Sequence, residues 1–391
     1  MRVENVKRRI DNRKLRNKRV LIFLCVLLIA FFTFGCRQQQ EIVLEPGQPF
    51  PKERIVIGII HPNEIYSESL YDLAHYRGTL EMQQAIGLGE HQIIRKTNVF
   101  DRDPVATEGA IRDCIAEGAN IIIAMSWGYM DVCEKLALEF PSVIFAHATG
   151  IKHNDHNFSN YSIRIYQGRY LAGIVAGLAT QSNRIGFVAA RGRDNSEVTS
   201  GLNAFAMGVA SVNPDARVFV QVTHNWHDPM GENNAANALI AAGCDVITSH
   251  ANSPAAQIAA QNAGVLAIGY NADMSGEAPD AVITSVILNW GVFYIRFVQQ
   301  VIDGTFISQT NYYGLTEGAI DITPLNSRLA PQGAETSVNA ARQRILYEGF
   351  NIFDGILETN EGEIVGETGK TLSDDVILSG INWYYRNVME L

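Results

Sequence analysis

Asn120-Ile-Ile-Ile-Ala-Met-Ser-Trp-Gly-Tyr-Met-Asp131 contains an apolar run that stops abruptly at Ser126-Trp127-Gly128. A run of this kind is typical of a β-strand that is buried on both faces and leads into a helix. Open α/β sheets bind their ligands at the carboxyl ends of such strands. Two functions therefore compete for this stretch: Trp127 is a surface on which a flat ligand stacks, or Ser126 is the nucleophile of an Ala-x-Ser-x-Gly turn.

The alternation of apolar runs and helical stretches continues on both sides of this strand. One series runs from 54 to 146, and a second series runs from 166 to 269. Strands and helices joined by short loops predict two Rossmann-like lobes, each with a parallel sheet, and a ligand cleft between the lobes. We assign residues 54–164 and 284–325 to lobe one, and residues 165–283 and 326–391 to lobe two.

The N-terminal segment differs from the rest of the chain in charge. Residues 1–35 contain nine Lys and Arg against two acids, so residues 36–391 carry a net charge of −17. Sixteen uncharged, mostly apolar residues end at Gly35 and are followed by Cys36. This order is typical of an export signal, and the apolar segment is short for a membrane span.

Thr33-Phe34-Gly35-Cys36 resembles the lipobox of bacterial lipoproteins, although Leu usually stands at the position of Thr33. We therefore expect a signal peptide over 1–35, lipidation at Cys36, a polar tether over 36–53, and a body anchored outside the cytoplasm. A permanent N-terminal anchor helix is the alternative.

Composition excludes several partners and cofactors. The acidic body argues against nucleic acid, because binding to phosphates requires clustered Lys and Arg. The thiols Cys114, Cys133 and Cys244 lack the spacing of a zinc site and are expected to be buried and free. Neither a G-x-G-x-x-G nor a Walker A motif is present, so we expect no nucleotide cofactor.

Several short motifs in the body occur together in one known family. They are Gly168-Arg-Tyr-Leu-Ala-Gly173, Arg184-Ile-Gly-Phe-Val-Ala189, Asn203-Ala-Phe-Ala-Met-Gly208, Val212-Asn-Pro-Asp-Ala216, Trp226-His-Asp-Pro229, Asn289-Trp-Gly291 and Gly369-Lys-Thr-Leu-Ser373. Over residues 54–390 the chain resembles the basic membrane protein (BMP) family, and within it the branch that contains purine nucleobase binders.

The resemblance implies a type I periplasmic-binding fold and a substrate-binding lipoprotein of an ABC transporter. Such a protein captures a purine base or nucleoside without catalysis or cofactor, delivers it to the permease subunits, is held at the membrane by its lipid, and acts as a monomer. Two positions depart from the branch: Tyr66 stands where a Trp is expected, and Asn252 stands where relatives carry an acid.

Aromatic and amide or carboxylate side chains follow most of the predicted strands. Stacking and edge hydrogen bonds are what a purine requires, and Asp273 is the best single carboxylate for its N–H groups. The alternative for each aromatic is core packing, and for each Asn a turn or helix cap, most clearly at Asn252-Ser253-Pro254. The predicted ligand-binding residues are Tyr66, Trp127, Asn225, Trp226, Asp228, Asn252, Ser253, Asp273, Asn289 and Trp290.

Other functions remain open at this point. A secreted α/β hydrolase using Ser126 would need an acid and then a histidine, an order that Asp245 and His250 meet only nominally. Asp245 opens its predicted strand, so it is expected at the opposite end of the sheet from His250. His153 and His156 have a spacing that can ligate zinc but lack further ligands nearby. A sugar or metal binder on the same fold is the remaining alternative.

Overall fold

The apolar run of the sequence forms strand β3 (Ile121–Ala124), and all of its side chains are buried. It pairs in parallel with β1 (Ile57–Ile60) on one side and β4 (Ile144–Ala148) on the other. Ser126 accepts a hydrogen bond from the Gly128 N–H and starts a short 3-10 helix, η3 (Trp127–Tyr129). The strand-to-helix turn predicted from the sequence is therefore present.

The structure, a computed structural model, describes residues 43–65 and 69–391. Tyr66, Cys36 and the predicted signal peptide lie outside the described residues. From Leu44 to Leu391 the chain forms one unit. No helix in the described part of the chain is long and apolar enough to cross a membrane.

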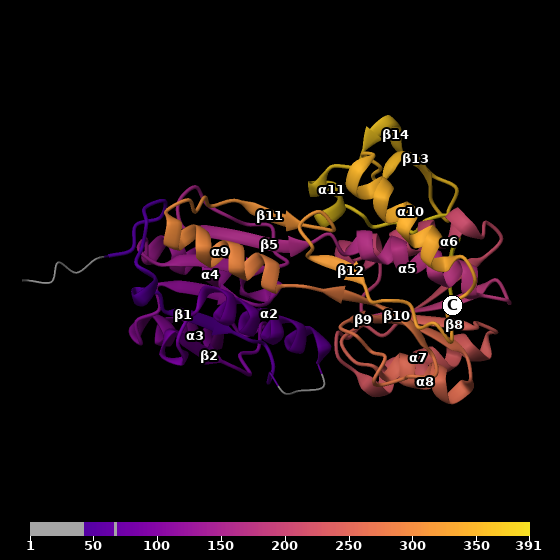
Figure 1. Ribbon diagram of the computed structural model, residues 1–391, viewed down its shortest axis with the longest axis horizontal. Helices are drawn as coiled ribbons and strands as arrows, with labels where there is room; N and C mark the ends of the chain where they lie inside the picture. The colour runs from indigo at the N-terminus through magenta and orange to yellow at the C-terminus, as the bar shows by residue number, and fades with distance from the viewer. Residues whose placement is uncertain (1–42, 66–68) are drawn as a thin grey trace, which may run out of the picture. The chain divides into compact units, whose positions relative to one another are not determined.

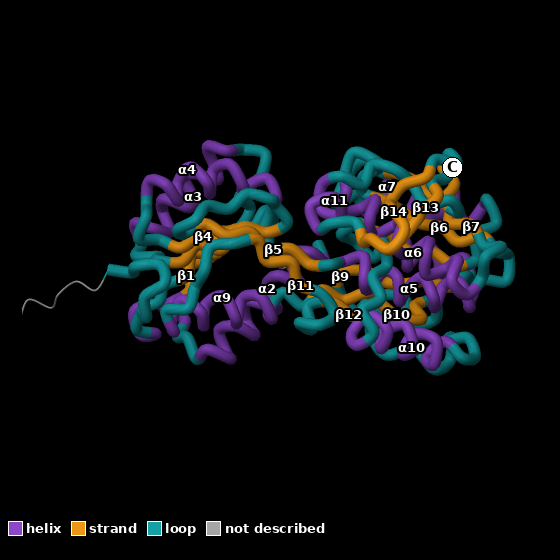
Figure 2. The backbone as a smooth tube through the Cα atoms, turned by 90° about the horizontal axis from the view of Figure 1, so that it is seen from above, coloured by secondary structure: helices purple, strands orange, loops and turns teal. Residues whose placement is uncertain are grey.

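The first sheet is parallel throughout, with strand order β11-β5-β4-β3-β1-β2. Figure 2 shows α3 and α4 on one face of this sheet and α2 and α9 on the other. The new elements are β2 (Ile93–Lys96), β5 (Phe158–Ile163), β11 (Thr310–Tyr313), α2 (Leu70–Ile86), α3 (Pro104–Ala116), α4 (Met130–Glu139) and α9 (Gly291–Asp303), with short 3-10 helices η1 (Lys52–Arg54) and η2 (Glu90–Gln92).

The second sheet has the order β12-β10-β9-β8-β6-β7-β15, and only the pair β10 and β12 is antiparallel. Helices α5 and α6 lie on one face, and α7 and α8 lie on the other (Figure 1). Its elements are β6 (Arg184–Ala189), β7 (Arg217–Val222), β8 (Val246–His250), β9 (Leu266–Asn271), β10 (Val282–Leu288), β12 (Ile320–Ile322), β15 (Val388–Glu390), α5 (Ile165–Ala179), α6 (Ser196–Val212), α7 (Pro229–Ala241) and α8 (Ala255–Ala263).

Glycines bring α5 and α6 unusually close together. A Cβ added at Gly173 would lie 2.1 Å from the Phe205 backbone oxygen, and one at Gly208 would lie 2.2 Å from the Tyr170 oxygen. Two of the motifs quoted above are thus explained by packing, because only glycine fits where two helix backbones touch.

The chain passes between the two sheets after β5, after β10 and after β11. The assignment of 284–325 to lobe one was wrong at β10 and β12. β10 pairs with β9, with Ile287 opposite Asn271, and β12 pairs with β10, so both belong to the second sheet. Within residues 284–325, only α9 and β11 lie in the first lobe. The apolar composition of a buried strand suits either sheet, which is why it did not reveal that β10 pairs with β9.

The last part of the chain adds structure to the second lobe. In Figure 1 the yellow segment lies over α5 and α6. β15 pairs in parallel with β7 and extends the second sheet by one strand. The other elements are α10 (Ala334–Tyr347), the antiparallel hairpin of β13 (Asp354–Glu358) and β14 (Ile364–Thr371), and α11 (Asp374–Ser379).

Candidate functional site

The carboxyl ends of both sheets lie next to the segments that connect the lobes. The Leu70 N–H, at the start of α2 in lobe one, donates to the Asn252 carbonyl after β8 in lobe two, at 2.9 Å. The Arg164 N–H after β5 donates to the Tyr313 carbonyl at the end of β11, at 2.7 Å. Because ligands of this kind of sheet bind at the carboxyl ends of the strands, this region is the candidate site.

An aromatic group forms the lobe-one side of this region. Trp290 is 1% exposed and stacks on His75 with ring centres 4.2 Å apart and an interplanar angle of 16°. Tyr71 lies one turn before His75 on α2, and the two rings form a T-shaped pair with their centres 4.3 Å apart. Tyr161 of β5 approaches Trp290 edge-on at 5.8 Å. We call Tyr71, His75, Tyr161 and Trp290 the aromatic floor.

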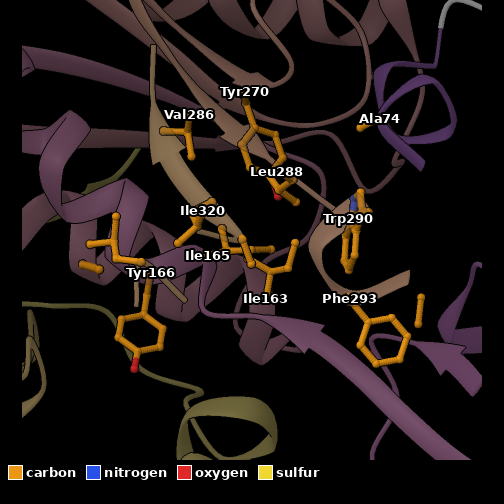
Figure 3. Packing of buried hydrophobic residues seen from close by; sticks show 14 of the residues in the cluster. Ala74, Ile163, Ile165, Tyr166, Tyr270, Val286, Leu288, Trp290, Phe293 and Ile320 are labelled. Atoms are coloured by element: carbon orange, nitrogen blue, oxygen red, sulfur yellow. The ribbon is translucent and has the colours of Figure 1, made fainter. Parts of the chain in front are cut away.

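A polar group forms the lobe-two side. The Tyr270 hydroxyl on β9 lies 2.8 Å from His250 Nε2, and that nitrogen lies 3.6 Å from a carboxylate oxygen of Glu197 in the first turn of α6. The buried Arg169 guanidinium covers the Tyr270 ring at 3.9 Å. We call Glu197, His250 and Tyr270 the polar wall. Figure 3 shows Leu288 between Tyr270 and Trp290. Burial raises the pKa of Tyr71 in the aromatic floor, and Tyr161, Glu197 and Tyr270 raise it further, so the two groups are neighbours.

Burial determines the charge of these groups. It raises the pKa of the Glu197 carboxyl to about 7, so this side chain can both donate and accept hydrogen bonds near neutral pH. Burial lowers the pKa of His75 and, with the positive charge of Arg169 as a second cause, that of His250. Both imidazoles are therefore neutral at pH 7.

Several buried polar atoms of this region have no hydrogen-bond partner among the described residues. They include Trp290 Nε1, His75 Nε2 and Asn271 Oδ1. Buried polar groups are nearly always paired in folded proteins, so unpaired ones that gather at one place are suited to a polar ligand or to water.

Two strand ends at this site have strained backbones. Thr149 after β4 has φ 57°, and Asn271 at the end of β9 has φ 69°. Asparagine tolerates this left-handed region, but a β-branched threonine does so at a cost, and such strain concentrates at functional sites. The Thr149 N–H donates to the Tyr161 carbonyl at 2.7 Å, which holds the strained turn against the aromatic floor.

A small cavity lies between the lobes beside the polar wall. Its volume is about 20 Å³, enough for a water molecule and far below the several hundred Å³ of a typical ligand pocket. A heterocycle can therefore enter only when the surrounding side chains or lobes move apart. The lining residues are Thr149, Ser162, Ile163, Ile165, Glu197, Ser200, Tyr312, Ile377 and Leu378.

Three of the predicted site residues lie in or beside this region. Trp290 belongs to the aromatic floor. Asn252 accepts a hydrogen bond from the Asn271 side chain at 3.0 Å and donates its N–H to the Trp226 carbonyl at 2.8 Å. The Trp226 ring centre lies 6.2 Å from that of His250. Asn252 and Trp226 therefore lie beside the polar wall.

Other predicted residues have local structural roles or face solvent. Asp228 caps α7 by accepting from the Gly231 N–H, and Ser253 donates to the buried Glu232 at 2.7 Å. Asp273 is exposed and accepts from the Ser275 N–H in a turn. Asn225 holds a similar turn with the His227 N–H, and Asn289 is exposed. The cap predicted as an alternative at 252–254 is formed in part, because the Ala255 N–H donates to the Ser253 hydroxyl.

The turn after β3 has one exposed and one hydrogen-bonded side chain. The Trp127 side chain is 60% exposed, while the Ser126 hydroxyl donates to Asp101 at 2.5 Å. Asp245 accepts from the backbone N–H groups of Gln181 and Ser182 before β8, whereas His250 ends that strand. The geometry therefore gives Ser126 neither of the triad partners that the hydrolase alternative named.

The metal alternative has no support in the described ranges. Within 43–65 and 69–391 no group of three or more His, Cys, Asp or Glu side chains is placed to hold a metal ion. The three thiols of the body are buried and free, as predicted.

Sequence reasoning missed Tyr71, His75, Glu197, His250 and Tyr270 as ligand-site candidates. Glu197 had a detectable signal, because it stands in the first helical turn after a buried strand, where other residues were selected. Tyr71 and His75 lie inside a helix, and only tertiary contacts reveal their position.

Comparisons with known proteins agree with this architecture. The sequence profile of the family described as "ABC transporter substrate-binding protein PnrA-like" matches residues 56–349. A purine-binding protein of Brucella abortus is 37% identical over 72% of this chain and 79% of its own length. A candidate glucose-binding protein of an ABC transporter in Haloferax volcanii is 36% identical over 60% of this chain and 59% of its own length.

Solved structures show the same fold. A solute-binding protein of an ABC transporter system from Conexibacter woesei superposes with a TM-score of 0.64 at 21% identity, covering 76% of this chain and 98% of that one. A transcriptional activator of the comK gene from Bacillus halodurans superposes with a TM-score of 0.67 at 17% identity, covering 75% and 99%. The predicted type I periplasmic-binding fold is thus confirmed.

Proposed function

The chain belongs to the family of PnrA-like substrate-binding proteins of ABC transporters, and we propose that it captures a purine nucleobase such as adenine between its lobes. The complex then docks on the ABC permease, which takes up the base. Ligand contacts made by both lobes favour the closed state, and that state is what the permease recognises.

The observation that carries this proposal is the set of unpaired polar atoms around an aromatic floor. A purine has two flat faces and an edge that alternates donors and acceptors. Trp290 Nε1 can donate, Asn271 Oδ1 can accept, and both are buried. The Brucella abortus relative, which is named a purine-binding protein, independently favours this ligand class.

We assign distinct roles to the residues of the site. The exposed indole of Trp127 offers a free face on which a base can stack, whereas one face of Trp290 already lies on His75. Glu197 replaces Asp273 as the carboxyl group that meets the edge of the base, because Asp273 is exposed and holds a turn. Stacking is worth about 1–3 kcal/mol per base, and edge hydrogen bonds supply selectivity.

A sugar is the second candidate ligand, favoured by the similarity to the Haloferax volcanii protein. Calorimetric titration of the purified protein with adenine, hypoxanthine, adenosine, glucose and zinc chloride separates the possibilities. We expect a purine base to bind with micromolar or tighter affinity. If glucose or zinc binds with micromolar or tighter affinity and no purine binds, the proposed ligand is refuted. The family assignment does not depend on this result.

We also propose that the protein is a monomer, tethered outside the cytoplasm by a lipid on Cys36. Changing Cys36→Ser should abolish incorporation of labelled palmitate and leave an unprocessed precursor. Continued acylation of this variant contradicts the proposed anchor.

A further inference from the structure

The C-terminal segment lines the cavity between the lobes although it lies outside the family match. The profile ends at residue 349. Beyond it, α11 supplies two apolar side chains, Ile377 and Leu378, to the cavity that Glu197 and Thr149 also line. Ile377 is 2% exposed, while Val376 on the same helix is 38% exposed and is not among the cavity residues.

A charged contact holds α11 at the connection between the lobes. Both oxygens of Asp374, the first residue of α11, accept from the Arg164 guanidinium, at 2.5 and 2.7 Å. That guanidinium also covers the Tyr312 ring at 4.2 Å. Arg164 lies in the connection after β5, and Tyr312 lies in β11 next to the connection that follows it, so α11 is fixed beside the part of the molecule that moves least when the lobes separate.

We propose that α11 is a specificity wall that favours a free purine base over a nucleoside, an inference that rests on the proposed function. Ile377 and Leu378 present only hydrocarbon to the cavity. A ribose placed against them would leave hydroxyl groups without hydrogen-bond partners, which costs more than the lost contacts alone. Polar groups that can meet the edge of a base also line the cavity: the Glu197 carboxyl, the Ser162 hydroxyl, and the Ser200 hydroxyl, which donates to the Glu197 carbonyl and can still accept a hydrogen bond.

The test compares the affinities of adenine and adenosine in wild type, Leu378→Ala and Ile377→Ala, with Val376→Ala as the matched control. We expect the ratio of adenosine to adenine affinity to rise about tenfold in the Leu378 and Ile377 variants, because truncation makes room beside the base. Adenine affinity should change less than threefold, and Val376→Ala should change neither value. Leu378 is only partly buried, so its variant keeps the test valid if Ile377→Ala unfolds.

The outcomes separate the two claims. If wild type binds adenine and the ratio of adenosine to adenine affinity is unchanged in both variants, the proposed role of α11 in specificity is wrong. The proposed function is then unaffected. The same change of ratio in Val376→Ala also overturns the proposed role of α11, because a general loosening of α11 would then explain the effect. Failure of wild type to bind any purine removes the proposed function and the wall together.

Discussion

The turn after β3 and the connection after β10 have the same local pattern and opposite environments. Each places a tryptophan and a glycine directly after a buried strand, in Ser126-Trp127-Gly128 and Asn289-Trp290-Gly291. Trp127 is 60% exposed, whereas Trp290 is 1% exposed. The difference comes from α2, which covers Trp290 through His75 and leaves Trp127 uncovered. A strand end thus positions a side chain, and a distant element decides whether it serves stability or binding.

The largest effect is expected from Trp290→Ala. The indole is fully enclosed and contacts three other rings, so its removal should cost about 3–5 kcal/mol of folding free energy. Urea unfolding followed by circular dichroism measures it. If Trp290→Ala costs less than about 1 kcal/mol of folding free energy, Trp290 and Trp127 do not differ in their contribution to stability.

The second prediction concerns Glu197, the partly buried carboxyl group that lies 3.6 Å from His250 Nε2. Because burial raises the pKa of Glu197 to about 7, ionisation of this group destabilises the folded protein. The penalty is absent below the pKa of the unfolded side chain and grows as the pH rises to about 7. Above that pH it is constant.

Glu197→Gln should therefore be more stable than wild type at pH 8, by up to about 3 kcal/mol, with a gap that closes toward pH 4. Unfolding of the ligand-free protein at pH 4, 6 and 8 measures the gap. A gap that does not depend on pH would show that Glu197 titrates normally in the folded state. The variant should also weaken adenine binding, since the amide keeps only one of the two acceptor oxygens of the carboxylate.

The third prediction tests the approach of α2 to the connection after β10. A Cβ added at Gly78 would lie 2.7 Å from the Gly291 backbone nitrogen and 3.1 Å from the Trp290 Cβ. Gly78→Ala should therefore destabilise the protein by about 1–3 kcal/mol through overpacking. The matched control is Gly109→Ala in α3, where a Cβ meets nothing within 4 Å and should stabilise the helix slightly. Equal effects of the two substitutions would argue against a close contact at Gly78.

The sequence was sufficient for the fold and for part of the site. Buried parallel strands such as β3 are uniformly apolar, so their alternation with helices could be predicted. The sheet to which β10 belongs could not be predicted, because an apolar strand suits either sheet and only its pairing with β9 in the structure identifies the correct one. Trp290 was selected from its place after a strand. Tyr71 and His75 were missed, because a helix face does not reveal what it packs against.

The smallest effect on stability is expected from Trp127→Ala, and this variant sharpens the comparison most. The indole is mostly exposed, so its loss should change the folding free energy by no more than about 0.5 kcal/mol. If it stacks on the bound base, the same variant should weaken adenine binding by about 1–3 kcal/mol, and adenine should quench less of the intrinsic fluorescence. The neighbouring Ser126→Ala is the control, because the serine hydroxyl is bonded to Asp101 and should leave the affinity within a few-fold of wild type. A variant at Trp127 that binds adenine as tightly as wild type would assign stacking to the aromatic floor, where Tyr71 is only partly buried and offers the remaining ring face.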